Sequence, residues 1–115
     1  MTIATLSQVL LPALHQNSAV AGLVVLGWED ARAYVDAAEA EGRPVILQAG
    51  PGCRAYTPLP VLAAMFRSLA DAAGVSVVAH LDHGENLAVC RQAIDLGFTS
   101  VMFDGSRLPL ARNID

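Results

Sequence analysis

One pattern of hydrophobic and polar positions repeats along the chain: a short apolar run, then an amphipathic stretch that ends at a glycine. The apolar runs cover residues 22–27, 44–50, 75–82 and 99–105. The stretches after the first three runs carry apolar residues every three or four positions, which predicts helices. Buried strands that alternate with helices are typical of a parallel sheet built from right-handed βαβ crossovers.

Capping residues predict where the helices begin and end. A first helix is expected over residues 4–15, and the helix after the first apolar run closes at Gly42, which can adopt the left-handed conformation. The next helix should start with Thr57 as N-cap and Pro58 at its first position, and end at Gly74. Its buried stripe is predicted to be Leu62, Phe66, Leu69 and Ala73.

The helix that follows the third apolar run is expected to run from Asn86 to Gly97. Its apolar positions predict that Leu87, Cys90 and Ile94 face the core. We therefore predict an α/β fold in a single domain over residues 1–115, with about four βα units.

Four such units are too few for either of the two common parallel α/β architectures. A doubly wound sheet usually has about five or six strands, and a TIM (β/α)8 barrel has eight strands in about 250 residues. Parallel strands that alternate with helices in about four units resemble the first half of that barrel.

The amino-acid composition excludes nucleic-acid binding and lysine-based catalysis as functions. The net charge is −4 and the basic residues are scattered singly, so no basic patch exists for nucleic acid. The chain contains no lysine, which excludes a Schiff-base or P-loop lysine. Carbonyl chemistry on this chain would therefore need a metal.

The sequence predicts a soluble, cytoplasmic protein. The apolar N-terminal segment, residues 1–28, has no Lys or Arg before Arg32 and is interrupted by polar residues, so neither a signal peptide nor a membrane span of about 20 residues is expected. Cys53 and Cys90 lack a CxxC spacing and suit free, buried thiols in a reducing compartment.

Ionisable side chains gather at the end of the third apolar run, in "HLDHGEN". Asp82 and His83 point to opposite faces of a regular strand, so they can share a site only if the chain leaves the strand between them, an exit that Gly84 makes feasible. An imidazole there can bind zinc while a carboxylate transfers a proton. His80 is either an orienting partner of Asp82 or a hydrogen-bonded core histidine.

The fourth run also ends in an acidic residue, in "FDGS". Asp104 either caps the following turn or offers a second carboxylate beside Asp82. The "GPGCR" segment, residues 50–54, follows a strand, and we interpret it as a plain turn because a lone glycine pattern is weak support for phosphate binding.

Residues 77–109 carry a family resemblance. "VVAHLDHGENLAVCRQAIDLGFTSVMFDGSRLP" resembles the third and fourth βα units of class II fructose- and tagatose-bisphosphate aldolases, and "GRPVILQAGPG" is similar to their second strand and turn. The resemblance covers nearly the whole chain but only the N-terminal half of the family's barrel. It implies a TIM barrel in which zinc polarises a ketose carbonyl.

The resemblance also implies roles for individual residues. His83 matches the first zinc ligand, and Asp82 matches the catalytic group that transfers a proton at the substrate hydroxyl. Asp104 matches an aspartate associated with a second or alternative metal position. Gly50 and Ser106 are the expected substrate-binding residues.

The chain departs from the family pattern in ways that bear on activity. Leu23 and Val24 stand where the family usually has Phe-Asn, and Gly50 replaces a Ser or Thr. The family's other two zinc histidines belong to the second half of the barrel, and neither His15 nor His80 matches them. Because a catalytic zinc site uses three protein ligands, this chain alone is not expected to be an active aldolase.

Three hypotheses remain. The chain is part of a zinc-dependent aldolase that cleaves a phosphorylated ketose to dihydroxyacetone phosphate and an aldehyde, or a non-catalytic half-barrel module that self-associates. A flavodoxin-like module is less consistent, because "GWED" puts acid where phosphate would bind. Exposed sheet edges predict either a homo-oligomer or a complementary half-barrel partner.

Overall fold

The computed structural model describes residues 3–114 and contains one parallel sheet. Its strands are β1 (Ala21–Val24), β2 (Val45–Ala49), β3 (Val77–Gly84) and β4 (Ser100–Phe103). They are hydrogen-bonded in chain order, β1-β2-β3-β4, and all three pairings are parallel. The predicted α/β alternation of parallel strands and helices is confirmed.

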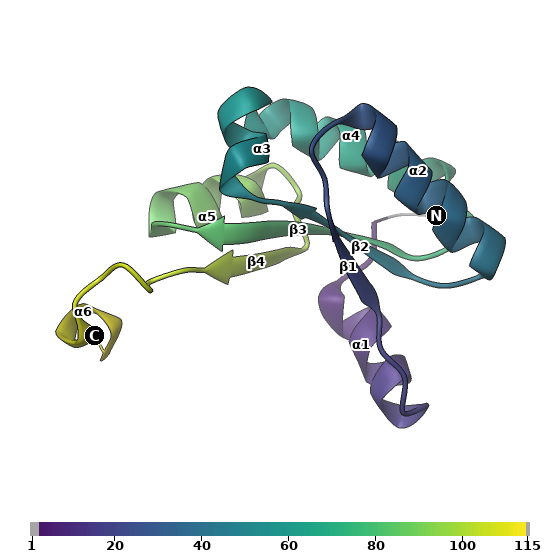
Figure 1. Cartoon of the computed structure of the whole chain (residues 1–115), viewed down its shortest axis with the longest axis horizontal. Coiled ribbons are helices and arrows are strands. Elements are labelled where there is room, and N and C mark those ends of the chain that lie inside the picture. Colours follow the sequence, from purple (N-terminus) through teal and green to yellow (C-terminus); the bar gives the residue numbers. More distant parts are fainter. Residues whose placement is uncertain (1–2, 115) are drawn as a thin grey trace.

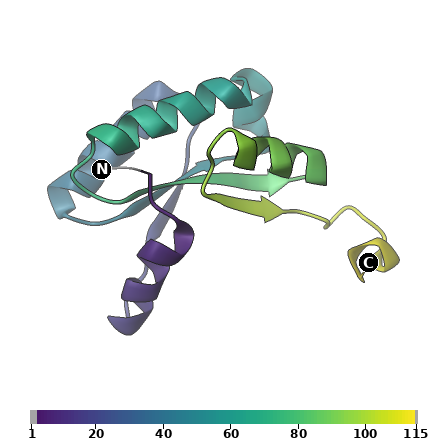
Figure 2. The same cartoon turned by 180° about the vertical axis from the view of Figure 1, so that it is seen from behind.

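Six helices accompany the sheet within residues 3–114. Helices α2, α3, α4 and α5 cover one face, whereas α1 lies on the other (Figure 1 and Figure 2). None of the helices in this part of the chain is long and apolar enough to cross a membrane. Their bounds are α1 (Leu6–His15), α2 (Trp28–Glu41), α3 (Pro51–Tyr56), α4 (Leu59–Ala72), α5 (Leu87–Asp95) and α6 (Leu110–Ile114).

The capping predictions are mostly confirmed, with one correction. Gly42 adopts the left-handed conformation at the end of α2, with φ of 60°. The segment predicted as a plain turn forms α3 instead, because Pro51 occupies a first helical position that suits proline. Thr57 is consequently the extended residue that ends α3, and Pro58 rather than Thr57 is the N-cap of α4.

The main core lies between the sheet and the helices on its covered face. The predicted stripe of α4 is buried there, and Phe66 packs against Phe98 with ring centroids 5.8 Å apart. The prediction for α5 is wrong in two places. Leu87 and Ile94 are 61% and 56% exposed, because α5 turns Cys90 and Ala93 toward the sheet instead.

Within residues 3–114, the opposite face of the sheet is covered only at one end. There α1 packs over a small cluster that includes Val9, Ile46 and Val78. Side chains alternate along a strand, so His80 and Asp82 share this face with Val78. They lie beyond the cluster, nearer the carboxyl end of β3, on the face that carries the site described next.

Candidate functional site

The end of β3 is irregular, and this brings Asp82 and His83 together. The register with β4 shifts between Leu81 and Gly84, and His83 has a φ of 49°. The left-handed conformation of a non-glycine residue costs about 1–3 kcal/mol, so the surrounding structure must hold it. As a result the Nε2 atom of His83 lies 3.7 Å from Oδ2 of Asp82.

The predicted exit from the strand between Asp82 and His83 does not occur, because β3 continues to Gly84. The two side chains meet instead at an irregularity inside the strand, and Gly84 does not produce it. His83 itself adopts the left-handed conformation. Gly84 is required for space, because a Cβ atom there would lie 2.6 Å from Sγ of Cys90 and 3.0 Å from the carbonyl oxygen of Met102.

His83 also contacts the acidic residue at the end of the neighbouring strand. Its Nδ1 atom lies 2.8 Å from Oδ2 of Asp104. This hydrogen bond, reinforced by the charge of Asp82, raises the pKa of His83 above the usual 6.5. His83 thus lies between two carboxylates, and one ring nitrogen is oriented by Asp104 while the other faces Asp82.

Asp104 is held by the turn that follows it. The backbone N–H of Ser106 donates to its Oδ1 atom at 2.9 Å. Hydrogen bonds from the Ser106 side chain and backbone, together with His83, lower the pKa of Asp104 well below its ordinary value. Both sequence-based interpretations of Asp104 describe part of this geometry, since it caps the turn and also reaches the neighbouring strand end.

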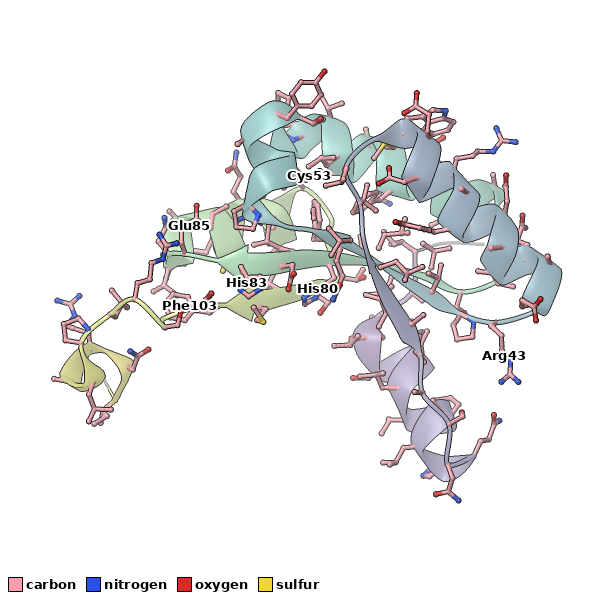
Figure 3. All side chains as sticks on the ribbon, viewed as in Figure 1. Arg43, Cys53, His80, His83, Glu85 and Phe103 are labelled. Carbon is pink, nitrogen blue, oxygen red and sulfur yellow. The ribbon has the colours of Figure 1, made fainter. Side chains whose placement is uncertain are left out.

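His80 links Asp82 to the next strand. Its Nδ1 atom lies 2.7 Å from the hydroxyl oxygen of Ser100, and its Nε2 atom lies 3.6 Å from Oδ1 of Asp82. Burial lowers the pKa of His80, with the charge of Asp82 opposing the shift. His80 is therefore both a hydrogen-bonded, largely buried histidine and a neighbour of Asp82, so neither sequence-based interpretation excludes the other. Figure 3 shows His80 and His83 along the part of β3 that runs beside β4.

A cavity of about 410 Å³ opens at this end of the sheet. Its position beside the His83–Asp104 pair makes it the natural place for a small ligand. Gly50, the N-cap of α3, is not among the described residues that line it, whereas Ser106 is. The lining residues are Pro51, His83, Glu85, Asp104, Ser106, Arg107 and Leu108.

Two contributors to the site were missed by sequence reasoning. Ser100 pairs with His80, and Arg54 forms an ion pair with Glu85. Pro51 in "GPGCR" could have indicated the short helix that carries Arg54, because proline at a first helical position predicts a helix rather than a plain turn.

The donor set fits one ligand of a zinc site. Metal-binding histidines usually donate their second ring nitrogen to a carboxylate, which is the relation of His83 to Asp104. Within residues 3–114 no group of three or more histidine, cysteine or acidic side chains is arranged to hold a metal ion. The described chain thus offers an oriented histidine and two nearby carboxylates, but not the three ligands of a complete catalytic zinc site.

Comparison with known proteins agrees with the fold and the motif. Residues 4–115 match the family model of class-II fructose-bisphosphate aldolase. The chain is 36% identical to 6-phospho-5-dehydro-2-deoxy-D-gluconate aldolase of Shouchella clausii, covering 100% of this chain and 40% of that protein. It is 41% identical to fructose-bisphosphate aldolase 2 of Cereibacter sphaeroides, covering 92% of this chain and 30% of that protein.

The structural match leads to the same family. The YdjI aldolase from Escherichia coli K12 superimposes with a TM-score of 0.88 and 30% identity, covering 97% of this chain and 44% of that one. The chain thus spans less than half the length of these relatives, and its four strands correspond to part of a TIM-barrel-type fold. It belongs to the class II fructose-bisphosphate aldolase family.

Proposed function

We propose that this chain supplies the Asp82–His83 part of a class II aldolase active site that reversibly cleaves a phosphorylated ketose to dihydroxyacetone phosphate and an aldehyde. The observation that carries the proposal is the convergence of His83, Asp82 and Asp104 at the carboxyl ends of β3 and β4, beside a cavity. Catalytic groups of TIM barrels lie at this end of the strands.

In this proposal Asp82 accepts and returns the proton of the substrate hydroxyl next to the bond that breaks. His83 would hold zinc through Nε2, because Asp104 already engages Nδ1. Bound zinc would supply a positive charge that polarises the ketose carbonyl. The carboxylate of Asp104 orients His83. We also propose this carboxylate as a ligand at a second or alternative metal position.

The proposed substrate is a phosphorylated ketose. The Shouchella clausii and Cereibacter sphaeroides relatives are named as aldolases of a phosphorylated sugar acid and a phosphorylated sugar. Ser106 lines the cavity and Gly50 lies at the adjacent end of β2, so both remain our candidates for substrate contact. The two free, buried cysteines suit a reducing compartment, and we propose the cytoplasm.

We further propose that the sheet is completed by another half barrel, either a second copy of this chain or a complementary segment. Both β1 and β4 are edge strands, and each leaves one row of backbone groups unpaired by the described strands. Completion could also bring further ligands for the zinc ion that His83 would hold. The described residues do not supply these ligands.

Zinc binding tests the proposal directly. We expect zinc to bind at one ion per chain, weakly in the isolated 115 residues, and His83→Ala to abolish binding. His15→Ala is the matched control, because His15 is an exposed histidine in the last turn of α1, away from the site. Zinc content is measured by mass spectrometry of metals after dialysis.

Activity is then measured as triose phosphate release from fructose 1,6-bisphosphate, using the native protein at its native mass and the 115-residue chain for comparison. Asp82→Asn should abolish release while leaving zinc bound. A folded wild-type protein that binds no zinc would contradict the proposal and leave a non-catalytic half-barrel module as the better description.

A further inference from the structure

Arg54 has the most extensively bonded guanidinium in the described chain, although it projects from the short helix α3 and not from β3. Its side chain is only 8% exposed. The Nη1 atom donates to the carbonyl oxygens of Ala49 at 2.7 Å and Asp82 at 2.6 Å. The Nη2 atom donates to the carbonyl oxygen of His83 at 3.1 Å and to Oε2 of Glu85 at 2.8 Å.

These four contacts match the chemistry of arginine and of no other side chain. The two terminal nitrogens of guanidinium carry four N–H donors in a fixed plane, and each donor has one acceptor here. Lysine carries three donors on a single atom and cannot reach the same spread of acceptors. Glu85 also balances the charge of a guanidinium that is largely removed from water.

Two of these contacts are to the backbone of Asp82 and His83, the residues proposed for proton transfer and zinc binding. Successive carbonyl groups of a regular strand point in opposite directions, so one cation cannot bind both. Here Arg54 binds the consecutive carbonyls of Asp82 and His83, where the strand is irregular and His83 is left-handed. The guanidinium therefore fits the bent form of this segment and not its extended form.

We propose that Arg54 is a positioning residue that holds the backbone of Asp82 and His83 in the conformation that brings their side chains together. It donates to the carbonyl oxygens of these residues and acts from the side of β2 through the contact to Ala49. The proposal rests on the proposed function for its catalytic meaning, but the conformational claim can be tested without zinc or substrate.

The test uses the whole chain, labelled for NMR and free of metal. In the wild type the ¹³Cα secondary shift of His83 should be positive, as in helical and left-handed residues. Arg54→Ala should abolish this positive shift, while the shifts of Val77 to Leu81 keep their strand values. Arg32→Ala is the control, because Arg32 pairs with Asp36 on the exposed face of α2 and should leave His83 unchanged.

Two conservative variants keep the test decisive if Arg54→Ala does not fold. Arg54→Lys retains the charge but not the four-way contact, so the His83 shift should be intermediate. Glu85→Gln leaves the carbonyl contacts in place, so His83 should stay left-handed. A wild-type His83 shift in Arg54→Lys or Arg54→Ala, with only a lower melting temperature, would overturn the proposal because the arginine would then be merely structural.

Zinc affinity supplies the second readout. Loss of a group that orients a metal ligand typically weakens metal binding about 10–100-fold. We expect this range for Arg54→Ala and no change for Arg32→Ala. If the wild type binds no zinc, the proposed aldolase function fails, whereas the His83 chemical shift still decides the role of Arg54.

Discussion

His83 is the residue on which the site depends, because it contacts one carboxylate through each ring nitrogen. Its Nδ1 atom pairs with Asp104 at 2.8 Å and its Nε2 atom lies 3.7 Å from Asp82. An exposed ion pair contributes little to stability, so the importance of this arrangement lies in orientation and protonation. The protonation state of His83 is therefore the most direct probe of the site.

Removing the Asp104 charge should lower the pKa of His83 toward its ordinary value. In the wild type that pKa is raised above 6.5, chiefly by the hydrogen bond to Asp104. We expect Asp104→Asn to lower it, as measured from the pH dependence of the imidazole proton shifts in metal-free protein. Asp36→Asn is the control, because Asp36 pairs with Arg32 on α2.

The sign of the linked stability change follows from the same shift. A histidine whose pKa is raised on folding stabilises the folded chain below its unfolded pKa of about 6.5, and this contribution is lost as the pH rises through the folded value. Asp104, with its lowered pKa, contributes above its unfolded value and loses that contribution in acid. An unchanged His83 pKa in Asp104→Asn would contradict the pairing.

At the scale of elements, helix α5 is docked onto the irregular end of β3. The contact is close at Gly84, where an added Cβ atom would lie 2.6 Å from Sγ of Cys90 and 3.1 Å from Cδ2 of Leu81. Cys90 is buried on α5, so the helix cannot move away without opening the core.

Gly84→Ala should therefore destabilise the chain, by about 1–3 kcal/mol for an overpacked site. Gly52→Ala is a matched control in α3, where an added Cβ atom meets nothing within 4 Å, and there alanine should be neutral or slightly stabilising. Urea unfolding followed by circular dichroism measures both changes. Equal stability of the two variants would show that the packing at Gly84 is looser than the structure indicates.

The elements also show what the sequence could predict. Apolar runs and glycine stops located the four strands and the helices α2, α4 and α5, because burial periodicity and caps are local signals. The exposure of Leu87 and Ile94 was not predictable, since both faces of α5 carry apolar residues and only packing selects one. The left-handed His83 and its contact with Arg54 were equally hidden, because the two residues are 29 positions apart.

At the scale of the whole molecule, the open sheet is the dominant feature. Four strands in chain order leave β1 and β4 as edges. Among the described residues, only α1 covers the face of the sheet opposite α2–α5 (Figure 1). Val24 on β1 is 51% exposed. Apolar side chains on an unpaired edge favour pairing with another strand.

We therefore expect the apparent mass of the chain to increase with concentration in sedimentation equilibrium. Val24→Lys should weaken this association at least about tenfold, or about 1.4 kcal/mol, because a lysine on an edge strand opposes strand pairing. Tyr56→Lys is the control, since Tyr56 is 87% exposed at the end of α3 and lies on no strand. A monomer at every concentration would exclude association through a sheet edge, and equal weakening by both variants would exclude association through β1. Association that depends on Val24 but not on Tyr56 would instead place the partner beside β1, where a further strand extends the sheet toward a barrel.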